Sequence, residues 1–446
     1  MLAGTWQGTM ALTEPQAGSS LSDVMTTATP LADNTYKVKG QKVFISAGDH
    51  DAADNIVHLM LARIEGAPRG TKGISLFVVP KYRLDGTPND VASTGIYHKM
   101  GQRGVPAMHL TMGENDDCLG YLVGQPHQGL PYMFQMMNEA RIGVGMTAAA
   151  IATAAYHAAL QYAKERPQSR RLNEKNLLDS PQTPIINHPD VRRMLLFQKA
   201  VTEGSLALLM ECSRLYDLAR VAEGAEKENA FLLLDLLMPV AKSYPAEMGV
   251  QAVSQSMQTL GGYGYTEDFP VEQLYRDIRI TPIYEGTTGI QAQDLLGRKM
   301  TMKGGKAPQL LFAEVGKTIA EAATHDDLKP YAGQLKTELG RLQDVTMSLL
   351  PHAQAGDIER FLCDATLYLD LFGIVTVAWQ WLKQAVVAKQ ALLTQNPQGD
   401  DLVFYEGKLH TMKYFFHYEV PKTQGLATRL KDPEVLTIVT AKELAL

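Results

Sequence analysis

The chain contains 446 residues, which is too long for one simple hydrophobic core and predicts two or three domains. Hydrophobic residues make up 45% of the sequence and charged residues 20%, an ordinary balance for a globular protein. The net charge of −6 excludes the dense basic surface that a nucleic-acid-binding protein needs, so we expect no nucleic-acid partner.

The spacing of the cysteines and the composition of the apolar segments bear on the cellular compartment of the protein. Cys118, Cys212 and Cys363 lie far apart in the sequence, a pattern that predicts neither a disulfide framework nor a zinc site and favours a reducing cytoplasm. Residues 1–9 contain neither a basic nor an apolar stretch and do not resemble a signal peptide. The best candidate for a membrane span, residues 142–160, is mostly Ala, Gly and Thr, which predicts a packed bundle helix instead.

Strands are expected up to about residue 115. The segments Tyr36–Ser46, Asn55–Ile64 and Gly73–Pro80 are short, rich in Val, Ile, Phe and Tyr, and bounded by Gly, Pro, Asn and Asp. We therefore expect residues 1–117 to form a β domain.

Near Gly129 the pattern changes to long windows with a period of 3.6 residues, which predicts helices. The expected helical windows of this second domain, residues 118–300, are Leu130–Glu165, Pro189–Glu223, Glu228–Leu260, Phe269–Asp277 and Gly289–Met300. A break at residues 302–308 separates a third domain, residues 301–446, which we expect to be a helical extension. Its expected helices are roughly Gln309–Ala323, Leu328–Leu350, Ile358–Leu393 and Leu402–Tyr418.

Two motifs in the β part carry possible binding chemistry. The segment Leu12–Ser20, LTEPQAGSS, predicts a turn whose backbone N–H groups can bind a phosphate or the polar edge of a ring. Such residues are also common in plain surface turns, so this segment alone leaves both interpretations open. The strand end Phe44–Ser46, FIS, could flank a flat cofactor, although most such triplets are ordinary sheet.

Two further motifs lie in the helical part. Three glycines follow Gln258 in QTLGGYGY; a helix stop explains one of them, and close approach to a ligand would explain all three. Helix cap and ligand loop therefore stay equally open. Glu285 stands beside Gly286 in IYEGTTG, ahead of a helix expected from about Ile290. It is either a solvated acid favoured by the helix dipole or a carboxylate that a ligand can approach closely.

In this order and spacing, the strings TEPQAGSS, FIS, LGGYGYTEDFPVEQLYRDIRI and IYEGTTGIQ closely resemble the signature segments of the acyl-CoA dehydrogenase family. The resemblance covers about residues 10–300. The strings GQRGVPAM and EGTTGIQAQDLLGRK are most similar to the large branch that includes 3-methylmercaptopropionyl-CoA dehydrogenases. The implied fold class is α+β, with an N-terminal antiparallel β-barrel-like domain, an all-α helical bundle and a helical C-terminal extension.

The resemblance implies bound FAD, and it assigns part of the cofactor to the β domain. By motif position, Leu12 and Thr13 would meet the edge of the isoalloxazine. Ser19 would face the FAD pyrophosphate or the CoA end of the substrate. Ile45 and Ser46 match the strand-end pair that touches the flavin ring near N5.

The helical part would contribute the remaining FAD contacts. Arg166 falls in the segment that reaches the FAD diphosphate of a neighbouring subunit, so we expect a homodimer or a homotetramer. Gln258, Gly261 and Gly262 match the loop that holds the ADP half of FAD, and Thr287 matches a further FAD contact.

Glu285 matches the catalytic base of the family, and the chemistry fits that assignment. The α-proton of a thioester is barely acidic, so its base must be close and desolvated, which should raise the pKa of Glu285. Glu285 would take the α-proton while the β-hydride leaves for flavin N5. Asn138, Arg141 and Gly286 are the further positions expected at the acyl-CoA substrate, and no metal is expected.

The expected activity is α,β-desaturation of an acyl-CoA, with 3-methylthiopropanoyl-CoA as the best single guess and an electron-transfer flavoprotein as electron acceptor. The family begins with a helical domain, whereas the first flavin motif here starts at Leu12, so the resemblance implies a chain that lacks this domain. Asn138 and Gly289 also replace the Asp and Gln of many relatives. A truncated or non-catalytic flavin-binding relative and an acyl-CoA oxidase are therefore the alternatives.

Overall fold

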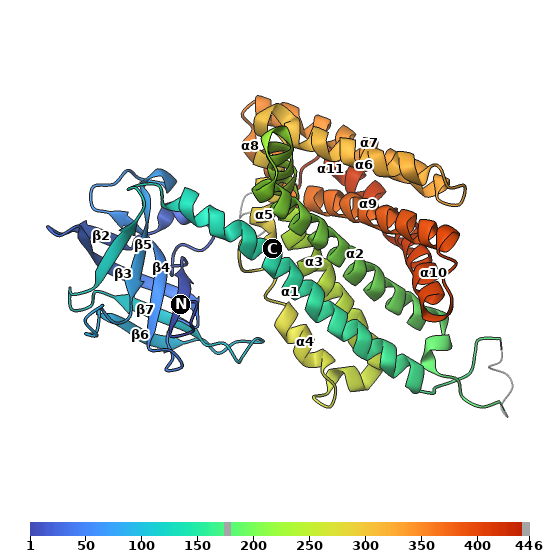
Figure 1. The fold of residues 1–446 in the computed structure, drawn as a ribbon, viewed down its shortest axis with the longest axis horizontal. Helices are drawn as coiled ribbons and strands as arrows, with labels where there is room; N and C mark the ends of the chain where they lie inside the picture. Colours follow the sequence, from blue (N-terminus) through green and yellow to red (C-terminus); the bar gives the residue numbers. More distant parts are fainter. Residues whose placement is uncertain (174–179, 439–446) are drawn as a thin grey trace. The chain divides into compact units, whose positions relative to one another are not determined.

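The computed structural model describes residues 1–173 and 180–438, and the chain divides into two compact units, residues 1–139 and 140–446 (Figure 1). The first unit contains all the named strands of the described residues, and the second contains helices. The order of a strand-rich part followed by helical parts confirms the expected fold class.

The β unit is a closed ring of strands with additions at its edges. Hydrogen bonds join β4 to β5, β5 to β8, β8 to β3, β3 to β2, and β2 back to β4, so the expected barrel-like closure is present. β1 extends the ring from β4, and β7 and β6 extend it from β3. The pairing is mostly antiparallel, but β1 and β2 both pair with β4 in parallel. The strands are β1 Trp6–Ala11, β2 Thr27–Pro30, β3 Thr35–Ser46, β4 Asn55–Ile64, β5 Ile74–Pro80, β6 Val91–Ile96, β7 Ala107–Met112 and β8 Leu119–Val123.

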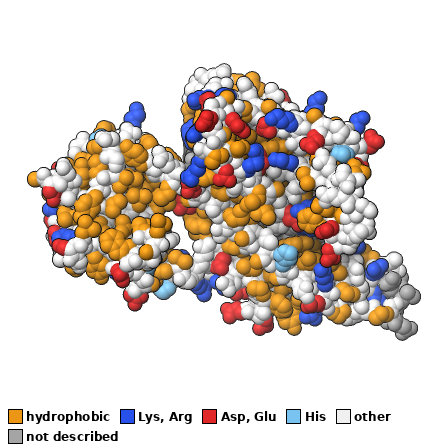
Figure 2. All heavy atoms as spheres, viewed as in Figure 1, with side chains coloured by type: hydrophobic (Ala, Val, Ile, Leu, Met, Phe, Trp, Pro, Cys, Tyr) orange, Lys and Arg blue, Asp and Glu red, His pale blue; other side chains and the backbone are white. Residues whose placement is uncertain are grey.

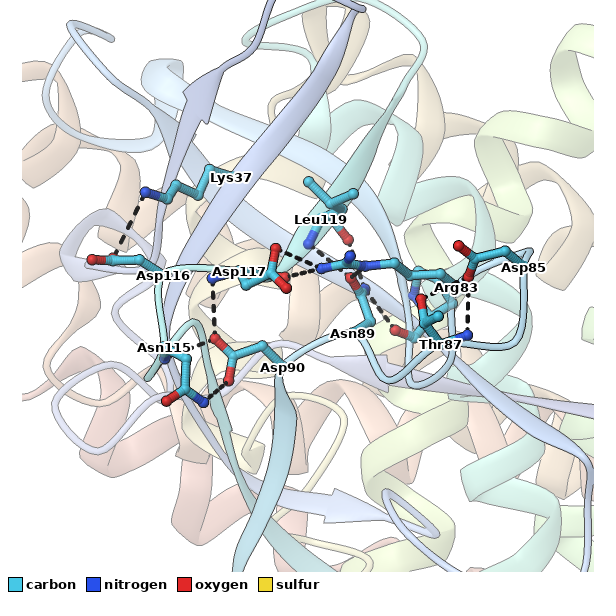
Figure 3. A network of polar contacts seen from close by, with 11 residues as sticks. Lys37, Arg83, Asp85, Thr87, Asn89, Asp90, Asn115, Asp116, Asp117 and Leu119 are labelled. Carbon is cyan, nitrogen blue, oxygen red and sulfur yellow. Dashed lines mark hydrogen bonds and ion pairs between the residues drawn. The ribbon is translucent and has the colours of Figure 1, made fainter.

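A polar network holds the last strand of this ring in place (Figure 3). The fully buried Asn89 donates from Nδ2 to the carbonyls of Pro80 and Leu119, both at 2.8 Å, and its Oδ1 accepts from the Leu119 N–H at 2.9 Å. Asp90 accepts from the N–H groups of Asn115 and Asp117. The side chain of Asn89 thereby ties the end of β5 to β8, which places residues 119–123 in the β unit, beyond the expected boundary at residue 117.

The surface of the β unit is partly apolar. Figure 2 shows hydrophobic side chains gathered over much of its visible face. Large apolar side chains exposed in this unit include Met25, Phe44, Ile96 and Met100. An exposed apolar surface of this kind is typical of a face that binds a ligand or another protein segment.

The second unit is a bundle of long helices. They are α1 Gly129–Glu165, α2 Pro189–Val221, α3 Gly224–Leu260, α4 Val271–Ile278, α5 Thr288–Asp294, α6 Lys306–Ala322, α7 Lys329–Gln354, α8 Ile358–Leu362, α9 Ala365–Thr394, α10 Gly399–Tyr414 and α11 Lys422–Lys431, and α1 begins in the first unit. Every expected helical window corresponds to helices of this set. The break expected after residue 301 is a short stretch in which Lys303, Gly304 and Gly305 all have positive φ, a conformation that ends a helix.

Helix α9 lies at the centre of this bundle, in contact with α2, α3, α5, α6, α7, α10 and α11. Its large side chains Phe372, Trp379 and Trp381 are at most 1% exposed. Helices α6, α7, α9 and α11 therefore pack on the same core as α2 and α3.

Two helical segments, α1 and residues 358–394, are long and apolar enough to cross a membrane by length and composition alone. The core helix of a globular bundle passes the same test, and 67% of the apolar window in residues 358–394 is buried within the unit. The apolar character of α9 is therefore that of a helix buried in the core of the bundle.

Candidate functional site

A buried ion pair anchors the turn of residues 12–20 in the β unit. The Lys42 ammonium donates to Glu14 Oε1 at 2.8 Å and to the carbonyls of Leu12 and Leu61 at 3.1 and 2.8 Å. Glu14 Oε2 accepts from the N–H of Met25 at 2.7 Å. Both ends of the pair are almost completely buried, so Leu12 and the neighbouring Thr13 are held on a rigid support. Within the same turn, Ser19 is exposed.

The strand end Phe44–Ser46 coincides with an irregularity in the sheet. The register between β3 and β7 shifts between Lys42 and Ile45, and Phe44 has a φ of 59°. The Ile45 side chain is in the β core at 2% exposure, whereas Phe44 and Ser46 are exposed. Any contact of Ile45 with a ligand on this surface must therefore use its backbone, while Ser46 can offer its hydroxyl.

In the helical unit, the glycine segment after α3 lies beside Arg166. The Arg166 guanidinium stacks over the ring of Tyr162 at 5.1 Å and over the ring of Tyr263 at 5.3 Å. Gln258 and Gly262 are exposed, and a Cβ added to Gly262 would meet no atom within 4 Å. Gly261, with a φ of 62°, caps α3. The structure thus brings together Arg166, Gln258, Gly261 and Gly262, four of the expected cofactor residues.

Glu285 lies in a strained turn just before α5. Glu285 has a φ of 55° and Gly286 a φ of 85°, so two successive residues are in the left-handed region, which is uncommon for a residue with a side chain. The buried Gln291 donates from Nε2 to the Glu285 carbonyl at 3.2 Å. The Thr287 hydroxyl accepts from the Ile290 N–H and caps α5. The turn is therefore fixed by the helix that follows it.

Charged side chains surround the Glu285 carboxylate. Its Oε2 is buried and has no hydrogen-bond partner among the described residues. Burial raises the pKa of Glu285, and the charges of Arg141 and Lys242 act in the opposite direction. Arg141 is itself buried and pairs with Asp294 at 3.6 Å. A half-buried carboxylate with a raised pKa and an unpartnered oxygen is suited to accept a proton from a substrate.

The sequence prediction missed the most unusual of these side chains, Lys242. It lies in α3 between Pro239 and Pro245, in a long apolar stretch. A single lysine inside such a stretch is the signal that could have identified it, because a buried lysine requires a reason. The side chain of Asn138 lies outside the described residues. Arg141 lies where its charge acts on Glu285, and its expected contact with CoA stays a prediction.

Comparisons with known proteins agree with this architecture. Residues 9–114 match the family model "Acyl-CoA dehydrogenase, middle domain", residues 127–300 match "Acyl-CoA dehydrogenase, C-terminal domain", and residues 311–438 match "Acetyl-CoA dehydrogenase C-terminal like". The fold is similar to that of the acyl-CoA dehydrogenase from Bacillus anthracis solved in complex with FAD. The TM-score is 0.75 at 20% identity, over 98% of this chain and 71% of that one.

Two relatives match along nearly the whole chain. A 3-methylmercaptopropionyl-CoA dehydrogenase of Ruegeria pomeroyi is 40% identical over 97% of this chain and 73% of its own length. A butyryl-CoA dehydrogenase of Syntrophomonas wolfei is 36% identical over 99% of this chain and 74% of its own length. The chain therefore belongs to the acyl-CoA dehydrogenase family of FAD-dependent oxidoreductases.

Proposed function

We propose that this enzyme catalyses the α,β-desaturation of an acyl-CoA thioester, with Glu285 as the base that removes the α-proton. The observation that carries the proposal is the Glu285 carboxylate, which is half-buried and has an oxygen without a partner among the described residues.

Glu285 would act through its burial and its fixed turn. Desolvation makes the carboxylate a stronger base, which helps because the α-proton of a thioester is only weakly acidic. We propose that the backbone N–H of Glu285 donates to the thioester carbonyl, so that negative charge on its oxygen is stabilised as the proton leaves. Gly286 has no side chain and therefore lets the thioester approach the turn closely.

The residues of both units fit FAD in their chemistry. In the helical unit, the open space over Gly262 and the neighbouring Arg166 suit a nucleotide with phosphate groups, for which we propose Gln258 and Gly261 as further contacts. FAD, when bound, would accept the β-hydride of the substrate at N5. The contacts proposed in the β unit and before α5 are Leu12, Thr13, Ser19, Ile45, Ser46 and Thr287.

The substrate and the partners are proposed from the relatives. The relative with 40% identity bears the name of a 3-methylmercaptopropionyl-CoA dehydrogenase, which supports 3-methylthiopropanoyl-CoA over butyryl-CoA. We propose Ser19, Asn138, Arg141 and Gly286 as substrate contacts. An electron-transfer flavoprotein is the proposed acceptor, and a homodimer or homotetramer the proposed assembly. The three cysteines are free, which supports the cytoplasm as the compartment.

Anaerobic addition of acyl-CoA to the purified yellow protein tests this function. Bleaching of the flavin by 3-methylthiopropanoyl-CoA, faster than by butyryl-CoA, is the expected result. Rapid return of the colour in air would identify an oxidase, and a flavin that ignores every thioester would identify a non-catalytic relative. Glu285→Gln should retain FAD and lose bleaching. Glu314→Gln, which changes a half-exposed carboxylate on α6 that pairs with Lys317, should bleach like the parent. Equal bleaching in Glu285→Gln would overturn the assignment of the base.

A further inference from the structure

Lys242 of α3 is a buried cation in the helical unit. Its side chain is fully buried in the helical unit, and its ammonium has no hydrogen-bond partner among the described residues. Among the described residues, the two other lysines that are buried as deeply both have carboxylate partners, Lys42 with Glu14 and Lys299 with Asp235. Because an unpaired buried ammonium opposes folding, its retention in the core needs an explanation other than stability.

Three elements bring charged groups to this cation. Arg141 comes from α1, Glu247 from α3 itself, and Glu285 from the turn before α5. Asp294 of α5 pairs with Arg141, and the Thr288 hydroxyl donates to Glu247 at 2.5 Å. Arg141 and Glu247 therefore have partners elsewhere. Lys242 Nζ and Glu285 Oε2 are both buried and without a hydrogen bond among the described residues, as are Arg141 Nε and Asp294 Oδ2, whose side chains pair with each other.

We propose that Lys242 is a positioning residue for Glu285, whose ammonium keeps the buried carboxylate ionised and ready to accept the α-proton. This inference rests on the proposed function of Glu285. Before proton transfer the two charges attract each other across the bundle. After transfer, Glu285 is a neutral acid, and the buried Lys242 has lost one of the two negative charges that act on it, with Glu247 as the other. The electrostatic cost of that state favours release of the proton from Glu285 to solvent, which restores the base for the next substrate.

The charges around Lys242 agree with this role. Burial lowers the pKa of Lys242 to about 8, opposed by the negative charges of Glu247 and Glu285, so the group is mostly protonated at neutral pH. Burial raises the pKa of Glu285, and the positive charges of Arg141 and, to a smaller extent, Lys242 lower it. The interaction is mutual, since each charge stabilises the charged form of the other.

The experiment follows the pH dependence of flavin reduction in the FAD-loaded protein. In the parent, the rate should fall as the pH drops through the pKa of Glu285, because the protonated acid cannot accept a proton. Lys242→Met should move this acid limb to higher pH, as expected on loss of an opposite charge. Lys242→Arg, which keeps the charge, should move the limb back toward its parental position.

The matched control is Lys299→Met, which removes an equally buried lysine that is paired with Asp235 and lies 4.0 Å from Asp294. It should lower the stability of the protein and leave the acid limb in place. An equal shift in Lys299→Met and Lys242→Met would show a general loss of packing and would overturn the role of Lys242.

A second measurement does not depend on turnover. The infrared band of the protonated Glu285 carboxyl, identified by its loss in Glu285→Gln, should appear at a higher pH in Lys242→Met than in the parent. If Lys242→Met fails to fold, NMR of ¹³C-labelled lysine can compare Glu285→Gln with the parent. Lys242 should then titrate at a lower pH once its counter-charge is removed.

The outcomes separate the two proposals. Flavin reduction that survives in Glu285→Gln would overturn the proposed function. A second outcome is loss of flavin reduction in Glu285→Gln while Lys242→Met leaves the acid limb and the infrared band at their parental pH. It would retain Glu285 as the base and overturn the proposed role of Lys242. If Lys242 titrates at the same pH in Glu285→Gln as in the parent, the proposed role of Lys242 is likewise overturned.

Discussion

The backbone at Glu285 and Gly286 shows how single residues set the geometry of the proposed base. Both residues have positive φ, and the carbonyl between them accepts a hydrogen bond from Gln291. The sequence prediction explained Gly286 by the approach of a ligand. The structure adds a second reason, since a Cβ at this position would lie 2.5 Å from Gln291 Nε2. The glycine thus permits both the turn and the hydrogen bond that fixes it.

Gly286→Ala should therefore be more harmful than an alanine at another left-handed glycine. The backbone cost at a φ of 85° is about 1–2 kcal/mol, and displacement of Gln291 adds to it. The rate of flavin reduction should also fall, by about 100-fold if the Glu285 carboxylate moves by about 1 Å. Urea unfolding and single-turnover reduction measure the two effects. Gly356→Ala is the control, because Gly356 has a φ of 78° and open space around its Cβ. Equal losses in both variants would contradict the part given to Gln291.

At the scale of elements, the turn of residues 12–20 depends on β3. Lys42 of β3 lies under this turn and binds Glu14 and the Leu12 carbonyl, so the strand that ends in Ser46 also holds Thr13. Burial alone would raise the pKa of Glu14, but its charge interaction and hydrogen bonds with Lys42 and its other hydrogen bonds lower it overall. Two of the expected cofactor-binding motifs are thus joined by one buried ion pair.

Lys42→Met should destabilise the β unit by about 3–5 kcal/mol, because it leaves the Glu14 carboxylate buried without its cation. Addition of Glu14→Gln to Lys42→Met should recover part of this loss, since the second change removes the unpaired charge. Lys39→Met is the control on the same strand: Lys39 pairs with Asp116 at 3.1 Å on the surface, and its loss should cost less than about 1 kcal/mol. Urea unfolding measures all three variants. A double variant that is less stable than Lys42→Met would contradict the role of the ion pair.

At the scale of the whole molecule, the sequence predicted the order of the parts well because the local patterns are strong. The strand windows Tyr36–Ser46 and Asn55–Ile64 and the long helical windows correspond to β3, β4 and the helices of the bundle. The parallel pairing of β1 with β4 was not predictable, since it joins segments almost fifty residues apart and no local pattern records it. Lys242 was missed for a similar reason. Besides Glu247 on the same helix, its surroundings include charges on α1 and before α5, which lie about a hundred and about forty residues away in sequence.

The glycine segment after α3 allows a test of FAD binding on the whole chain. Gly262 has open space around its Cβ and no positive φ, so Gly262→Ala should leave the protein without FAD as stable as the parent. If FAD phosphates approach this backbone closely, the methyl group should weaken binding. FAD at 100 times its Kd should stabilise the parent by about 2.7 kcal/mol, and the same FAD concentration should stabilise Gly262→Ala less. Thermal unfolding with and without FAD measures the difference. Gly340→Ala, at an equally open glycine within α7, should keep the full stabilisation by FAD. Equal stabilisation of Gly262→Ala and Gly340→Ala would mean that the segment is a helix cap and not a cofactor loop, the alternative that the sequence alone left open.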